Sequence, residues 1–210
     1  MKNMLKNVSF TFLILKSCLL FSQGIEANKV VVIDPGHGGN DPGAIGINEI
    51  QEKDVVLDIA GAISKLNKES DSPLEIYLTR DRDTLISLSD RTKIARALKA
   101  NLFLSLHCNH SDNPNARGIE VYVGNRKTKF SDSSIWLAYK LESDFKNKLG
   151  FEGRGVKFAN FQVLRETILD MPSVLLELGF LSNQDEYDYF LKPNSTKILA
   201  ELIWYVLNKK

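Results

Sequence analysis

Four residues in this sequence have side chains that together could bind a metal ion and move protons. They are His37, Glu52, His107 and Glu177. Two neutral imidazoles and one carboxylate can hold a zinc ion and leave a fourth coordination position open for water. A further carboxylate close to that position can accept protons from the water. The set therefore predicts hydrolytic chemistry at a metal centre, if the fold brings the four side chains together.

His37 follows a run that has the character of a buried strand. The apolar residues Val31–Ile33 end at Asp34, Pro35 cannot donate to a strand ladder, and glycines flank the histidine on both sides. This turn would carry the imidazole over the carboxyl end of the strand, where open α/β sheets bind their ligands. A glycine-rich turn with a surface histidine would explain the same segment without any function.

His107 ends a second apolar run, Leu102–Leu106, so its side chain is expected at the same sheet edge. A histidine at the end of a core strand can also be a hydrogen-bonded polar residue without a ligand. Glu52 opens a helical pattern, where an acidic residue complements the helix dipole. Glu49 and Asp54 lie in the same stretch and are alternatives that the residue pattern alone does not exclude.

Glu177 interrupts an otherwise apolar strand, Val174–Leu178. A carboxylate in such a place costs several kcal/mol unless it is paired, protonated or beside a metal ion. A structural salt bridge to Arg165 is one explanation. We favour a role in proton transfer, because burial raises the pKa of a carboxyl group toward the range that suits a general base.

Short apolar runs alternate with longer segments of helical period along the chain. Strands are predicted at Lys29–Asp34, Leu74–Thr79, Leu102–His107, Ile119–Val123, Phe161–Leu164 and Val174–Leu178. Helices are predicted at Glu52–Asn67, Leu88–Ala100, Ser134–Leu149 and Ser195–Leu207. Ser87 and Asp90 have capping-box spacing at the start of the second helix, and Gly150 is a stop signal after the third. The alternation predicts an α/β fold, a largely parallel sheet of about six strands flanked by helices on both faces.

Several segments also carry a longer pattern. They are Asp34–Asp41 with Gly43–Ala44, Glu52–Val55, Leu78–Asp81, Leu88–Arg91 with Ala95, Leu104–Asn109 and Pro172–Asn183. In type and order these segments resemble the motifs of the zinc-dependent N-acetylmuramoyl-L-alanine amidases, which cut bacterial peptidoglycan, and the resemblance runs from residue 30 to residue 183. It implies a twisted mixed sheet, one zinc ion held by His37, Glu52 and His107, and Glu177 as the catalytic acid/base.

Such an enzyme hydrolyses the amide bond between N-acetylmuramic acid and the L-alanine of the stem peptide. Two other classes stay open, a carboxypeptidase-like zinc peptidase acting on wall peptides and a non-catalytic wall-binding domain. The second would be expected to lack one of the four site residues, and none is missing here. Some relatives carry an inhibitory helix that plugs the zinc cleft. No such helix is apparent between Val123 and Phe161, so we expect an open site, and an activator protein is not visible in the sequence.

Three residues are candidates for contact with the substrate. Asn109 and His110 lie in the loop after the strand that ends at His107, although a solvated loop explains His110 equally well. Arg165 could bind a muramyl or peptide carboxylate through two hydrogen bonds. Cys108 is expected to point away from its neighbour His107 into the core, because side chains alternate along a strand.

The N-terminus indicates where the protein acts. Residues 1–24 combine lysines, an apolar run and a small-residue end, which is typical of a secretory leader. We therefore predict a cleaved leader at residues 1–24 and one domain at residues 25–210, exported to the periplasm or cell wall. Lipid attachment at Cys18 is an alternative, although Lys16 lies just before it and an apolar run follows it.

Charge excludes one class of partner. Three of the 27 lysines and arginines and none of the 26 acids lie in the leader, so 24 basic side chains face 26 acidic ones in the rest of the chain. Without a basic surplus we do not expect nucleic-acid binding. Peptidoglycan is the expected partner, and we expect a monomer.

Overall fold

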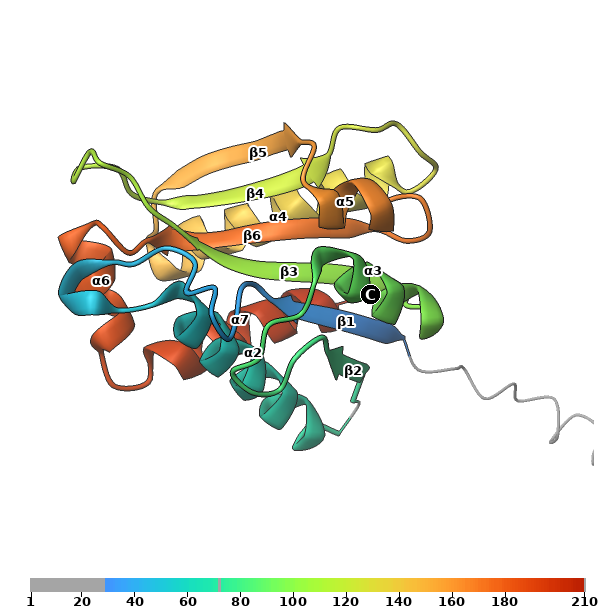
Figure 1. Ribbon diagram of the computed structural model, residues 1–210, viewed down its shortest axis with the longest axis horizontal. Coiled ribbons are helices and arrows are strands. Elements are labelled where there is room, and N and C mark those ends of the chain that lie inside the picture. The colour runs from blue at the N-terminus through green and yellow to red at the C-terminus, as the bar shows by residue number, and fades with distance from the viewer. Residues whose placement is uncertain (1–28, 72, 210) are drawn as a thin grey trace, which may run out of the picture.

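The computed structural model describes residues 29–71 and 73–209, which form one six-stranded sheet with helices on both faces (Figure 1). The strands are β1 (Val30–Pro35), β2 (Glu75–Leu78), β3 (Leu102–Asn109), β4 (Ile119–Gly124), β5 (Gly153–Ala159) and β6 (Ser173–Phe180). Their order across the sheet is β2-β1-β3-β6-β4-β5. The pairs β2–β1, β1–β3, β3–β6 and β4–β5 are parallel, and β6–β4 is antiparallel. The predicted largely parallel sheet is confirmed.

Buried apolar runs explain why the central strands form. Val31, Val32 and Ile33 of β1 are fully buried, and β3 and β6 are almost continuously buried. Strands that read as unbroken apolar runs are typical of sheets covered on both faces. The carboxyl ends of β1, β3 and β6 therefore meet at one edge of the sheet, where polar residues follow the apolar runs.

The helices are α2 (Glu52–Lys68), α3 (Leu88–Ala97), α4 (Ser131–Leu149), α5 (Gln162–Thr167), α6 (Gln184–Leu191) and α7 (Ser195–Asn208), with a short 3-10 helix η1 at Ile47–Glu49. Buried residues of α2, α4 and α7 share one large core cluster with the sheet. α3 and α5 lie together over its other face (Figure 1). The four predicted helices are confirmed, including the cap of α3 by Ser87 and the end of α4 at the left-handed Gly150.

One predicted strand is wrong. Phe161–Leu164 does not form a strand, since α5 begins at Gln162, and the fifth strand is β5 at Gly153–Ala159. The helix places Val163 and Thr167 one turn apart, both buried. β5 is an edge strand that carries two glycines and is only partly buried, so it lacks the apolar alternation that marks a strand in a sequence. α6 was also not predicted.

The remaining observations concern the N-terminal segment and the helix α4. The predicted leader at residues 1–24, with Cys18, lies outside the described residues. Among residues 29–71 and 73–209, no helix is both long enough and apolar enough to span a membrane. α4 packs on the face of the large core cluster, where Leu137, Leu141 and Phe145 are buried.

Candidate active site

The turn after β1 positions His37. Its backbone has a φ of 59°, a left-handed conformation that non-glycine residues seldom adopt. The amide of Gly38 donates to the carbonyl of Asp41 at 2.9 Å, and the Asp41 amide donates back to Gly38 at 3.2 Å. The Asp41 carboxylate also meets Nδ1 of His37 at 2.8 Å. This contact orients the ring and leaves Nε2 facing Glu52, an arrangement typical of metal-binding histidines.

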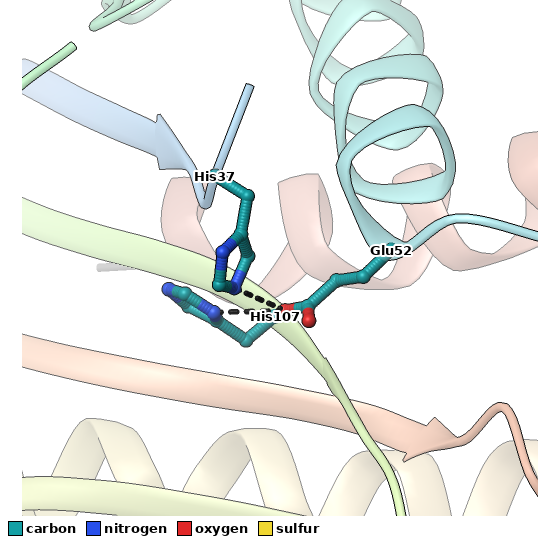
Figure 2. Close-up of side chains that lie close together, drawn as sticks. All are labelled: His37, Glu52 and His107. Carbon is teal, nitrogen blue, oxygen red and sulfur yellow. Dashed lines mark hydrogen bonds and ion pairs between the residues drawn. The ribbon is translucent and has the colours of Figure 1, made fainter. Parts of the chain in front are cut away.

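The carboxylate of Glu52, the first residue of α2, contacts both histidines (Figure 2). His37 follows β1, and His107 belongs to β3. One of its oxygens, Oε1, lies 3.2 Å from Nε2 of His37 and 2.8 Å from Nδ1 of His107. The same oxygen accepts the Cys108 amide at 2.9 Å, and Oε2 accepts the Ala44 amide at 2.7 Å. Burial acts to raise the pKa of Glu52, but its hydrogen bonds with the two histidines outweigh this effect and lower it.

Glu52, and not Glu49 or Asp54, faces the two histidines. Ligand atoms of His37, Glu52 and His107 all lie within 4.8 Å of one another, and the two rings have centroids 5.0 Å apart. Burial lowers the pKa of His37, but Glu52 and then Asp41 raise it to a net value of about 9. The carboxylates of Glu52 and Asp41 therefore make this site attractive to cations. A divalent ion competes with protons for such ligands, so the donor set fits a zinc ion.

Two glycines allow this close packing. A Cβ on Gly36 would collide with the ring of His107, and a Cβ on Gly43 would collide with Oε2 of Glu52 and with the His37 ring. Gly43 also has a φ of 66°, which favours glycine. The glycines of the motif are therefore required by the approach of the candidate metal ligands as well as by the turn.

Glu177 lies beside His107 on the neighbouring strand, since the two are register partners in the β3–β6 pair and point to the same face. Its Oε2 is buried without a hydrogen-bond partner among the described residues. Burial is the main reason that its pKa rises to about 7. A buried polar atom without a partner is rare and suggests a missing ion, water or substrate.

The suggested salt bridge between Arg165 and Glu177 is wrong. The Arg165 guanidinium instead donates to the backbone carbonyl of Asn160 at 3.0 Å, on the exposed side of α5. Of the other two substrate candidates, Asn109 is half-buried at the end of β3, where its amide group faces Glu120 at 3.3 Å. His110 is exposed in the loop that follows. Cys108 is buried in the large core cluster, on the face away from His107, as expected.

A buried ion pair supports the turn, and its role was not predicted. Arg91 pairs with Asp34 at 2.7 Å and also donates to the carbonyl of His37 at 2.6 Å. Arg80 donates to the carbonyls of Gly36 at 2.7 Å and Lys53 at 2.8 Å. Both arginines belong to matching motifs, but only the fold shows that Arg91 fastens the His37 turn to β1 and that Arg80 fastens this turn to the start of α2.

A cavity of about 750 Å³ opens beside three of the four site residues, within the size range of small-molecule sites. It reaches from His37, His107 and Glu177 to α3 and α5. Its apolar lining comes from Leu85, Ile86, Leu88, Phe161, Val163 and Leu175.

Residues 31–209 match the model of a protein family described as N-acetylmuramoyl-L-alanine amidase. The chain is 40% identical over 159 residues to the N-acetylmuramoyl-L-alanine amidase LytC of Bacillus subtilis (strain 168), a match that covers 75% of this chain and 30% of LytC. The chain thus spans about a third of that curated relative.

Solved structures of similar fold are amidases as well. The catalytic domain of CwlV, an N-acetylmuramoyl-L-alanine amidase from Bacillus (Paenibacillus) polymyxa var. colistinus, is 37% identical with a TM-score of 0.76, and the match covers 85% of this chain and 96% of that domain. The CwlD amidase of Clostridioides difficile, solved in complex with the GerS lipoprotein, is 27% identical with a TM-score of 0.77, over 86% of this chain and 96% of CwlD.

Proposed function

Because this chain belongs to the N-acetylmuramoyl-L-alanine amidase family, we propose that it hydrolyses the amide bond between N-acetylmuramic acid and the L-alanine of the peptidoglycan stem peptide. One observation carries the proposal. The side chains of His37, Glu52 and His107 come together, and the buried carboxyl group of Glu177 lies beside them without a partner among the described residues. A metal-binding set and an unpaired acid/base on one face of a sheet are the parts that amide hydrolysis needs.

His37, Glu52 and His107 would hold one zinc ion. When bound, zinc polarises the scissile carbonyl and acidifies water, lowering its pKa from about 15.7 toward roughly 7. The supporting contacts of the chain prepare the three ligands for this role. Asp41 orients His37, and two backbone amides hold the Glu52 carboxylate in place.

Glu177 is the proposed acid/base. Its carboxylate takes a proton from the attacking water and then gives a proton to the leaving amine of L-alanine. Burial raises the pKa of this carboxyl group to about 7 in the metal-free protein, toward the range that suits an acid/base near neutral pH. The absence of a salt bridge to Glu177 among the described residues keeps the group available for this exchange.

Product analysis tests this function. Mass spectrometry of purified peptidoglycan treated with the zinc-loaded mature protein, residues 25–210, should find intact stem peptides that begin with L-alanine and glycan with free lactyl carboxyl groups. Release of single amino acids instead would identify a peptidase. Elemental analysis should find about one zinc ion per chain, and His37→Ala should lose it. Full zinc occupancy and activity in His37→Ala would disprove the ligand assignment.

The place of action and the partners follow from the proposed function. Peptidoglycan lies outside the cytoplasmic membrane, so the protein would act in the periplasm or cell wall after removal of the leader at residues 1–24. Zinc and the polymer are its required partners. The CwlD relative was solved with a lipoprotein, but we propose that this chain acts as a monomer and has basal activity without an activator.

A further inference from the structure

A second group of charged residues lies on the site face of the sheet, on the side of Glu177 away from the metal ligands. Glu120 of β4 is the register partner of Glu177, so their side chains are neighbours on one face. Lys157 and Arg154 of β5 reach Glu120 from the next strand. Together with Tyr122, these residues are called the Glu120 cluster.

The Glu120 carboxylate holds the two cations in place. Its Oε1 is 2.8 Å from Nζ of Lys157 and also accepts a hydrogen bond from Nε of Arg154. Its Oε2 accepts a hydrogen bond from the Tyr122 hydroxyl at 2.6 Å. Burial acts to raise the pKa of Glu120, but these hydrogen bonds lower it, so the group is ionised near neutral pH. The Arg154 guanidinium also lies 5.0 Å from the ring of Phe180, which restricts its position.

The Glu120 cluster contains two cations and one carboxylate, so one positive charge is not neutralised within it. Two cations share one buried carboxylate, and neither has a second carboxylate partner within residues 29–71 and 73–209. The side chains of Arg154 and Lys157 are 34% and 38% exposed, whereas that of Glu120 is 4% exposed. Both cations therefore reach solvent with unused donors, held by a carboxylate that solvent hardly touches.

The opposite side of Glu177 has different chemistry. There the cavity has an apolar lining, and Asp41 and Asp90 lie on its wall. Arg91 is the one arginine or lysine among the described residues that line it, and its donors already serve Asp34 and the carbonyls of Pro35, His37 and Ile86. Beyond the metal site itself, the described cavity wall therefore offers no unused arginine donor and no lysine, whereas the Glu120 cluster offers two part-exposed cations.

We propose that Arg154 and Lys157 bind a carboxylate of the stem peptide, so that the peptide lies over β4 and β5 and the uncharged sugars occupy the cavity. The inference rests on the proposed function and states how the substrate is oriented across the sheet. β5 lies two strand spacings from β6, about 10 Å. An extended peptide spans about 3.3–3.6 Å per residue. The bound carboxylate therefore belongs to the second or third residue after the scissile bond.

A purely structural role for the cluster leads to a different result. Arg154 and Lys157 could serve only to fasten the edge strand β5 to β4 through Glu120. Loss of either cation would then lower stability, but it would not change the preference of the protein between charged and uncharged peptides. The preference is therefore the quantity to measure.

The test uses two peptides and the zinc-loaded mature protein. One peptide is L-alanyl-γ-D-glutamyl-L-lysine with free carboxylates, and the other has both carboxylates converted to carboxamides. Calorimetry gives a Kd for each peptide at low salt. The wild type should bind the free acid more tightly, and Lys157→Gln should reduce the ratio of the two Kd values about fivefold, near the upper limit for a partly exposed ion pair. Lys157→Arg, which keeps the charge, should retain the ratio.

Two further variants complete the test. Lys197→Gln removes a 70% exposed lysine on α7 and should leave the ratio unchanged, which controls for net charge. Arg154→Gln should reduce the ratio as Lys157→Gln does, and it serves as the second variant if Lys157→Gln folds poorly. Equal binding of both peptides by the wild type, or an unchanged ratio in both Gln variants at the cluster, would overturn the inference.

Cleavage of purified peptidoglycan, measured in parallel, separates the two proposals. A wild type that prefers the acid peptide but releases no stem peptides, even after a periplasmic or lipid-anchored partner is added, would leave the binding site standing and refute the amidase function. A wild type that releases stem peptides without any preference between the peptides would leave the function standing and refute the role of Arg154 and Lys157.

Discussion

At the scale of single residues, the site depends on carboxylates in three different environments. Glu52 is buried and bonded to two backbone amides, and its hydrogen bonds with the two histidines lower its pKa. Glu120 is buried against two cations. Glu177, which shares a sheet face with Glu120, is buried without a partner among the described residues, and its pKa is raised. These three environments fit the roles proposed for the three carboxyl groups, which are metal binding, holding cations and proton transfer.

The role of Glu177 can be separated from metal binding. Glu177→Gln removes the proton acceptor but leaves His37, Glu52 and His107 unchanged. We expect zinc content and thermal stability close to those of the wild type, with turnover of peptidoglycan decreased on the order of 10²-fold or more. Elemental analysis, thermal unfolding and stem-peptide release measure the three quantities.

A matched control is Glu201→Gln on the exposed surface of α7, which should leave all three unchanged. Near-normal turnover in Glu177→Gln would remove this residue from the mechanism. Loss of zinc in the same variant would mean that Glu177 is a ligand.

At the scale of elements, sequence patterns predict the parts of the fold that are buried and long. Strands β1, β3 and β6 are largely apolar and buried, and α2 has a regular apolar stripe, so both patterns are visible in the sequence. β5 is half-buried, and α5 is only six residues long, so local preference did not determine them. Their structures depend on what they pack against, which the sequence does not state.

The same division applies to the site. The convergence of His37, Glu52 and His107 was expected, because the resemblance identifies these candidate metal ligands at recognisable motifs. The Glu120 cluster was not expected, because its contacts depend on the register of β4 with β5 and β6. The suggested pairing of Arg165 with Glu177 was wrong for a related reason, since α5 was read as a strand and its exposed face could not be foreseen.

The turn after β1 and the start of α2 can be tested as one unit. In Gly43→Ala, the added methyl group would collide with Glu52 and His37, and the φ of 66° would be strained. We expect at least a tenfold loss of zinc affinity, because displaced ligands bind the metal poorly. Competition with a chelator gives the affinity.

Gly61→Ala is the matched control for this substitution. Gly61 lies in α2, and a Cβ there would meet no atom within 4 Å. Since alanine is the better helix former, this variant should gain up to about 1 kcal/mol in unfolding free energy with unchanged zinc affinity. Equal zinc affinity in Gly43→Ala and the wild type would show that close packing at this turn does not position the ligands.

At the scale of the whole molecule, the sheet separates a structural face from a chemical one. α2, α4 and α7 bury the large core cluster on one face. His107, Glu177 and Glu120 lie on the other, where α3 and α5 cover the region next to the cavity (Figure 1). The longest segment between β4 and β6, the helix α4, therefore packs away from the site.

This arrangement predicts activity without a partner. A helix that plugs the cleft would have to lie on the face of His107 and Glu177. In the described chain between β4 and β6, α4 covers the opposite face and α5 lines the cavity without closing it. The zinc-loaded mature protein alone should therefore release stem peptides from purified peptidoglycan, and Glu177→Gln under the same conditions should not. If the loaded protein is silent until a periplasmic or lipid-anchored partner is added, the site requires activation, and the open cleft is not sufficient for catalysis.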